Sequence, residues 1–168
     1  NRKILIAGSA NPELKGMGTT VTGVLITGIG RYVINIGDSR TYLYLPDGTM
    51  RQITVDHSLL QDMIAHGELT PEEAENFPRK NVLTNALGVW ENVRVDIFVC
   101  NDPVSGFLIC SDGLHGYVEE EVIRSIVMDR HMDPALRVRK LYNAAMDAGG
   151  FDNITVVLID WEGDLYHE

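Results

Sequence analysis

Four aspartates stand at the ends of apolar, strand-like segments, each beside glycine, serine, histidine or asparagine. They are Asp38 in NIGDSR, Asp56 in TVDHS, Asp112 in CSDGL and Asp152 in GGFDN. The ends of buried strands hold side chains rigidly, and small neighbours let a metal ion or a water molecule approach. Carboxylates that converge without a cluster of histidines and cysteines favour Mg²⁺ or Mn²⁺ over zinc. Such a cation lowers the pKa of a bound water and holds a phosphoryl group, so these residues indicate metal-assisted phosphate chemistry.

One aspartate of this kind is a weak signal, because aspartate beside glycine is common in turns. Asp47, in Pro46-Asp47-Gly48, belongs to that structural class.

The net charge is a second indication that a cation takes part in the chemistry. The 14 Lys and Arg stand against 24 Asp and Glu, which gives a net charge of −10 with no basic run. We therefore expect no nucleic-acid partner, and an acidic protein that handles phosphate needs a cation between the two.

Six segments occur in a fixed order along nearly the whole chain. They are GMGTT (16–20), NIGDSR (35–40), TVDHS (54–58), NVLTNALG (81–88), LICSDGL (108–114) and GGFDNITVV (149–157). In wording and order they resemble the metal-dependent protein serine/threonine phosphatases of the PP2C (PPM) family, in their bacterial form.

This resemblance implies an α+β fold of two stacked antiparallel β-sheets flanked by helices, in α-β-β-α order. It implies a centre of two Mn²⁺ or Mg²⁺ ions, with a third ion held more weakly in bacterial members. A metal-activated water would hydrolyse phosphoserine or phosphothreonine without a phosphoenzyme. The implied partners are phosphorylated proteins and a cognate serine/threonine kinase, whose action the enzyme would reverse.

The resemblance also assigns roles to residues. Asp112 and Asp152 match metal ligands of the main centre, and Asp56 matches a ligand of the third ion. The residues expected to support the site are Ser111, Gly113 and Asn153. No catalytic residue is expected beyond the metal ligands.

Asp38 and Arg40 in GDSR are hallmarks of the same family, and we interpret both as structural. An aspartate and an arginine two residues apart at a strand end can satisfy turn amides and a buried partner. We also expect a structural role for His57, and we expect His115 to be an exposed turn residue. Thr19 and Thr20, as in other members, are expected to start a strand.

Residues 59–80 correspond to the mobile flap that lies next to the active site in the family. Arg79 and Lys80 are candidate contacts for a phosphopeptide, with a solvated charge pair as the alternative. Phe77 and Asn85 depart from the family, since bacterial relatives tend to carry His and Arg there. These departures affect the expected substrate contacts more than metal binding.

The main departure lies at the start of the chain. A complete member carries, upstream of GMGTT, an acidic metal-site residue, a phosphate-binding arginine and a DGMGG-type segment whose aspartate bridges both metals; Lys15 precedes Gly16-Met17-Gly18 here. We expect residues 1–160 to be the larger, C-terminal part of the phosphatase domain, without its N-terminal strands, and 161–168 to be a polar tail. Two carboxylates alone do not fix a dinuclear centre, so we expect this chain alone to be inactive.

Two other function classes remain open. The first is a catalytically inactive, phosphatase-like binding or regulatory module. The second is a cysteine-based or P-loop phosphotransfer enzyme, which lacks support because the sequence has neither a GxxxxGK[ST] motif nor a nucleophilic cysteine motif.

Periodicity and turn signals predict the elements that must position these residues. We expect a first helix that is already under way at residue 1 and is broken by Asn11-Pro12, and a short helix that starts at Pro71 and ends before Pro78. Further helices are expected at 58–66, 119–128 and 134–148, and strands at 19–29, 32–36, 41–45, 49–54, 93–100, 106–110 and 153–160. The first four strands are expected to form one antiparallel meander, and residues 81–88 to be irregular or a short strand. This order predicts helices packed on antiparallel sheets.

The length of 168 residues is enough for one globular domain and hardly for two. Cys100 and Cys110 lie in apolar runs with no zinc-binding spacing, which predicts reduced core cysteines in a cytoplasmic protein. No apolar stretch has the length of a membrane span, and no signal peptide is visible.

Overall fold

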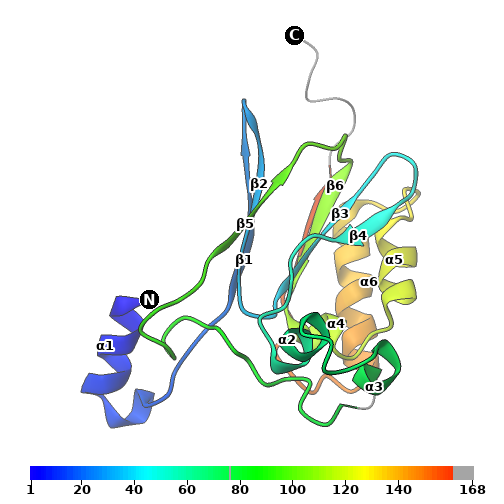
Figure 1. Ribbon diagram of the computed structural model, residues 1–168. Helices are drawn as coiled ribbons and strands as arrows, with labels where there is room; N and C mark the ends of the chain where they lie inside the picture. The colour runs from blue at the N-terminus through cyan, green and yellow to red at the C-terminus, as the bar shows by residue number, and fades with distance from the viewer. Residues whose placement is uncertain (76, 161–168) are drawn as a thin grey trace.

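The computed structural model describes residues 1–75 and 77–160, which form two antiparallel sheets. The first sheet has the order β1 (Val21–Thr27), β2 (Gly30–Ile36), β5 (Asp96–Cys100). The second has the order β4 (Met50–Gln52), β3 (Arg40–Tyr44), β6 (Gly106–Cys110), β7 (Val156–Asp160). Helices α5 (Glu120–Val127) and α6 (Pro134–Asp147) lie on the second sheet (Figure 1). The predicted stacked antiparallel sheets with flanking helices are confirmed, and the predicted tail at 161–168 lies outside the described residues.

Alternation of side chains along the strands produces two apolar layers. Between the sheets, Val33 of β2 packs with Leu43 of β3 and Phe107 of β6, all fully buried. The second layer joins the other face of the second sheet to the helices, with Leu108 against Leu141. Burial on both faces explains why the central strand β6, GFLIC, is a continuous apolar run in the sequence.

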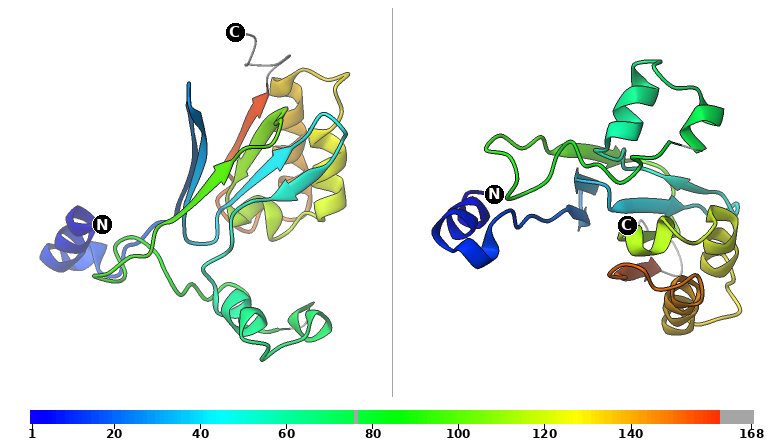
Figure 2. Two further views of the ribbon diagram at one scale, coloured as in Figure 1. Left: turned by 45° about the horizontal axis from the view of Figure 1, so that its top comes forward. Right: turned by 90° about the horizontal axis from the view of Figure 1, so that it is seen from below.

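The outward face of the first sheet is apolar and exposed. Leu25, Ile97 and Val99 are 59%, 64% and 58% exposed, and the strand register puts them on one face. None of the helices in the described part of the chain covers this face (Figures 1 and 2).

The predicted four-strand meander is wrong, because the chain changes sheets between β2 and β3. Gly37 makes this crossing possible. Its φ is +105°, and a Cβ there would overlap the side chain of Thr20. Only glycine adopts that conformation without strain. The crossing places Asp38 at the edge where both sheets end.

Side-chain hydrogen bonds mark the starts of two short helices. Ser58 Oγ accepts a hydrogen bond from the Gln61 N–H at 3.2 Å and begins α2 (Leu59–Ala65). Thr70 and Glu73 exchange backbone-to-side-chain hydrogen bonds at the start of α3 (Pro71–Glu75). The remaining helical segments are α1 (Arg2–Ala10), the 3₁₀ turn η1 (Pro12–Leu14) and α4 (Asp112–His115).

Helix α1 lies apart from the sheets and is tied to the loop at residues 86–91 (Figure 2). Asn1 Nδ2 donates to the carbonyl oxygens of Trp90 and Glu91 at 2.8 and 2.9 Å, and the Gly88 N–H donates to Asn1 Oδ1 at 2.8 Å. Across the described residues, every helix is too short or too polar to cross a bilayer.

Candidate metal centre

Three carboxylates line one cavity at the edge where the sheets end. The cavity has a volume of about 400 Å³, and its acidic residues are Asp38, Asp112 and Asp152. The strand register explains why they meet. Arg40 pairs with Cys110, and Cys110 pairs with Val156, so the start of β3, the end of β6 and the start of β7 share one edge.

The carboxylates of this cavity repel one another. Burial raises the pKa of Asp112, and the negative charge of Asp152 raises it further, against the lowering effect of the Gly113 backbone N–H. Burial and then Asp112 raise the pKa of Asp38 to about 6. A bound cation would relieve this repulsion.

The donor set fits a hard cation but does not complete its coordination. All three acidic side chains offer oxygen, which suits Mg²⁺ or Mn²⁺. Among the described residues, no three His, Cys, Asp or Glu side chains lie close enough together to form a complete metal site. The described residues alone therefore do not form a closed cation site.

Ser111 joins the loops that carry Asp112 and Asp152. Its Oγ donates to the carbonyl oxygen of Asn153 at 2.9 Å and accepts the Thr155 N–H at 2.9 Å. The Asn153 N–H in turn donates to Asp152 Oδ1 at 2.7 Å. These hydrogen bonds connect the loop of Asp112 to the loop of Asp152.

Gly113 is packed against the same loop, and this predicts a stability effect. A Cβ at Gly113 would overlap the carbonyl oxygen of Asn153, which is backbone and cannot rotate away. We expect Gly113→Ala to lower the free energy of unfolding by about 1–3 kcal/mol, measured by urea denaturation. Gly28→Ala is the matched control, because a Cβ there meets nothing within 4 Å. Equal stability of the two variants would contradict the packing described.

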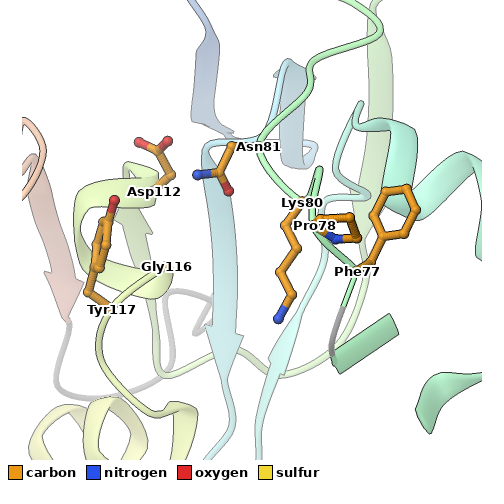
Figure 3. Close-up of a pocket in the computed structure, with 7 residues that line it drawn as sticks. All are labelled: Phe77, Pro78, Lys80, Asn81, Asp112, Gly116 and Tyr117. Carbon is orange, nitrogen blue, oxygen red and sulfur yellow. The ribbon is translucent and has the colours of Figure 1, made fainter. Parts of the chain in front are cut away.

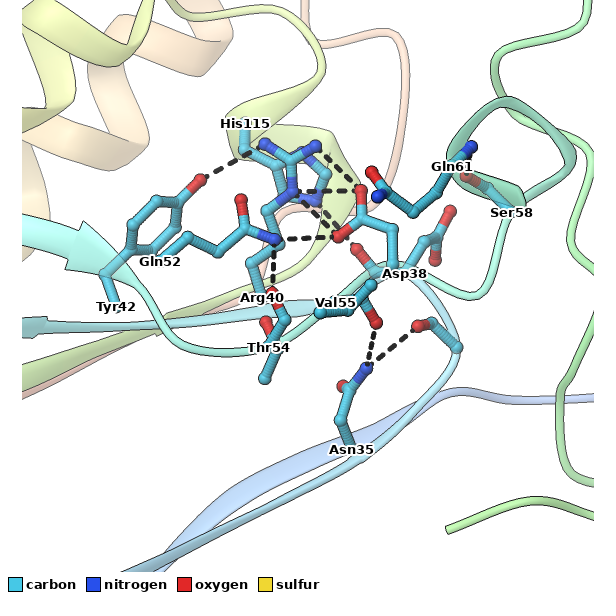
Figure 4. Close-up of polar contacts among 12 residues, drawn as sticks. Asn35, Asp38, Arg40, Tyr42, Gln52, Thr54, Val55, Ser58, Gln61 and His115 are labelled. Atoms are coloured by element: carbon cyan, nitrogen blue, oxygen red, sulfur yellow. Dashed lines mark hydrogen bonds and ion pairs between the residues drawn. The ribbon is translucent and has the colours of Figure 1, made fainter. Parts of the chain in front are cut away.

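Asp56 is paired with Arg40 and is not among the residues that line the cavity. Its partners Arg40 and Gln52 are labelled in Figure 4. Arg40 Nε lies 3.0 and 3.1 Å from the two carboxylate oxygens, and Nη2 lies 2.7 Å from Oδ2. Gln52 Nε2 donates to Oδ1 at 3.1 Å. These contacts agree with a structural role for Arg40. The role of Asp56 as a ligand of a third ion stays a prediction, and its negative charge raises the pKa of both Asp38 and Asp112.

Asp38, for which we expect a structural role, also lines the cavity. Its position follows from the crossing at Gly37 and from the pairing of β3 with β6, and neither is visible in the sequence. His115 differs from its expectation as an exposed turn residue. It lies half-buried in α4, and its Nε2 is 3.0 Å from the carbonyl oxygen of Asp38. Burial, with Arg40, lowers the pKa of His115 to about 4, so the neutral ring donates this hydrogen bond.

A second, smaller cleft adjoins the cavity on the side of the predicted flap (Figure 3). It has a volume of about 270 Å³ and lies between residues 77–81 and the end of α4, where Tyr117 stands. Asn81 and Asp112 line both the cleft and the cavity. Lys80 is also part of the lining, whereas Arg79 is exposed outside it.

Comparison with known proteins identifies the family. The sequence profile described as protein phosphatase 2C matches residues 3–147. The chain belongs to this family.

Similar proteins include bacterial serine/threonine phosphatases. The serine/threonine phosphatase stp of Listeria welshimeri is 38% identical over 161 residues, which are 95% of this chain and 63% of that protein. The crystal structure of Stp1 from Staphylococcus aureus matches with a TM-score of 0.85 and 32% identity, over 96% of this chain and 63% of that one. The catalytic domain of PstP in complex with two manganese ions matches with a TM-score of 0.75 and 34% identity, over 94% of this chain and 65% of that one. The chain thus spans a little under two thirds of the Listeria protein's length.

Proposed function

We propose that the protein is a metal-dependent protein phosphatase that hydrolyses phosphoserine and phosphothreonine. The observation that carries the proposal is the convergence of Asp38, Asp112 and Asp152 on one cavity, in a chain of the PP2C family. The naming of similar proteins as serine/threonine phosphatases supports the reaction class.

The carboxylates of Asp38, Asp112 and Asp152 would hold the divalent cations. The mutual repulsion of these carboxylates favours cation binding, because a bound cation neutralises their charge. A bound Mn²⁺ or Mg²⁺ lowers the pKa of an attacking water and neutralises phosphate charge. The complex of the PstP catalytic domain with two manganese ions supports this cofactor class. Ser111 and Asn153 keep the loops of Asp112 and Asp152 in register.

The cleft beside the cavity would receive the peptide that flanks the phosphorylated residue.

Lys80 lines this cleft. We expect Lys80→Ala to raise KM for an acidic phosphopeptide about 3–10-fold and to leave kcat nearly unchanged. The reason is that the contact of Lys80 with the peptide is equally strong in the ground state and in the transition state. Steady-state kinetics on the complete gene product measure this. Arg79→Ala is the matched control, expected to leave KM unchanged. A larger effect at Arg79 than at Lys80 would contradict the placement.

The expected partners are phosphorylated proteins and the serine/threonine kinase that acts on them. The thiols of Cys100 and Cys110 are free and buried, which supports a reducing, cytoplasmic compartment.

A second candidate function is a phosphatase-like binding module without activity. The observation in its favour is that the described residues do not assemble a complete metal site. Phosphate release from a phosphothreonine peptide by the complete gene product distinguishes the two functions. Mn²⁺-dependent turnover supports the enzyme, and its absence in a folded protein that binds the peptide supports the module.

A further inference from the structure

His57 is a fully buried histidine that does not line the candidate centre. It follows Asp56 in the segment between β4 and α2. A buried imidazole is unfavourable unless both ring nitrogens are hydrogen-bonded, and here both are. Its partners come from three other segments of the chain, and one of these is the turn that carries Asp38.

The partners of the ring define its tautomer. The Gly37 N–H donates to Nδ1 at 3.1 Å, and Asn85 Nδ2 lies 2.6 Å from the same nitrogen. Asn85 Oδ1 accepts the Arg94 N–H at 3.1 Å, which fixes the amide with its NH₂ group toward the ring. Because Nδ1 accepts, the proton of the neutral ring resides on Nε2.

Asp96 faces that proton. It begins β5, and its Oδ2 lies 2.9 Å from Nε2 of His57. Its other oxygen, Oδ1, is 3.2 Å from Arg94 Nε. The carboxylate therefore accepts from Nε2 and keeps Nδ1 free to accept from Gly37.

Gly37 directly precedes Asp38, and the backbone is held on both sides of this aspartate. His57 accepts the Gly37 N–H at Nδ1, and the His57 backbone N–H donates to the Gly37 carbonyl oxygen at 3.0 Å. The carbonyl oxygen of Asp38 is held by His115. Thr20 closes the remaining side, where its Oγ1 lies 2.7 Å from Ser39 Oγ.

We propose that His57, oriented by Asp96, is a positioning residue that fixes Asp38 in the cavity and thereby sets the affinity of the candidate centre for divalent cations. The chain of contacts runs from Asp96 through the ring to Gly37 and then along the backbone to Asp38. The inference rests on the proposed function, because it concerns the same centre.

Two substitutions of His57 separate its two nitrogens. In His57→Asn, the side-chain oxygen takes the place of Nδ1 and accepts from Gly37. In His57→Gln, the amide nitrogen takes the place of Nε2 and donates to Asp96, but Gly37 loses its acceptor. We expect His57→Gln to weaken Mn²⁺ binding about 10–100-fold, and His57→Asn to retain affinity closer to that of the wild type. Isothermal titration of the complete gene product with Mn²⁺ alone measures this.

Asp96→Asn tests the same chain without changing the buried ring. It replaces the charged acceptor of the Nε2 proton with a neutral amide oxygen and weakens the hydrogen bond that orients the ring, so we expect about tenfold weaker Mn²⁺ binding with the thermal midpoint of the metal-free protein close to wild type. Asp102→Asn is the matched control, since Asp102 pairs with Arg51 at an exposed site remote from the cavity. Nitrogen NMR of the ring should show Nε2 protonated in the wild type.

The outcomes separate this inference from the proposed function. Mn²⁺ binding by the wild type that weakens in Asp96→Asn and in His57→Gln, but not in Asp102→Asn, supports the inference. Equal Mn²⁺ affinity in the wild type, Asp96→Asn and Asp102→Asn overturns the inference and leaves the proposed function standing. A wild-type protein that is folded and binds no Mn²⁺ overturns both.

Discussion

Asp112→Asn in the complete gene product is expected to lower phosphatase activity at least about 100-fold and to weaken Mn²⁺ binding to a similar degree. Loss of a partner that only orients a metal ligand costs about 10–100-fold in affinity or activity, so loss of the ligand itself should cost no less. Asp112 lines both the cavity and the adjoining cleft, which makes it the central carboxylate of the site. Steady-state kinetics over a Mn²⁺ titration give both quantities.

The same substitution should not destabilise the metal-free protein. Because burial and Asp152 raise the pKa of Asp112, its ionised form is unfavourable in the fold, and the folded state loses stability as pH rises through that pKa. Asparagine removes this cost at neutral pH. We expect an equal or higher thermal midpoint without metal and a smaller rise on adding Mn²⁺.

Asp47→Asn is the matched control for Asp112→Asn. Asp47 is an exposed turn residue whose Oδ1 accepts the Thr49 N–H at 2.9 Å, and asparagine can accept the same hydrogen bond. Activity and Mn²⁺ affinity should equal those of the wild type. Retained Mn²⁺-dependent turnover in Asp112→Asn would contradict the ligand assignment.

Arg137→Met should lower the free energy of unfolding by about 3 kcal/mol. Arg137 is only 1% exposed; it forms an ion pair with Asp160 and donates to the Val127 carbonyl oxygen at 2.7 Å. Removing one partner leaves a carboxylate in a largely buried position, which typically costs about 3–5 kcal/mol. We expect the lower end of this range, because Arg130 still lies 3.2 Å from Asp160.

Denaturation in urea measures the effect of Arg137→Met, with Arg124→Met as its control. Arg124 is exposed and pairs with Glu121 at 2.7 Å on the surface of α5. Such exposed pairs contribute less than about 1 kcal/mol. A loss at Arg137 no larger than that at Arg124 would show that the buried pair does not stabilise the fold.

Much of the secondary structure was predictable because local signals specify it. Ser58, Asp133 and Pro134 mark helix starts that the structure confirms. The strand at 106–110 is a continuous apolar run and appears as β6 with those bounds. Helix α4 was not predicted, since four residues are too few to show a helical period.

The part of the site that depends on sheet pairing was not predictable. The sequence motifs marked Asp112 and Asp152 as candidate site residues, and both line the same cavity. Asp38 and Asp56 are alike in sequence, each an aspartate at a strand end. Their environments differ because Arg40 binds Asp56 while the crossing at Gly37 directs the chain of Asp38 to the cavity. Neither a long-range ion pair nor a change of sheet produces a pattern in the local sequence.

Phosphate release from a phosphothreonine peptide by the complete gene product is the most direct test of the proposed metal-dependent reaction. We predict release that requires Mn²⁺ or Mg²⁺, stops when the metal is chelated and is lost in Asp112→Asn while Asp47→Asn retains it. Release that persists without divalent metal, or that is unchanged in Asp112→Asn, would contradict the proposed function.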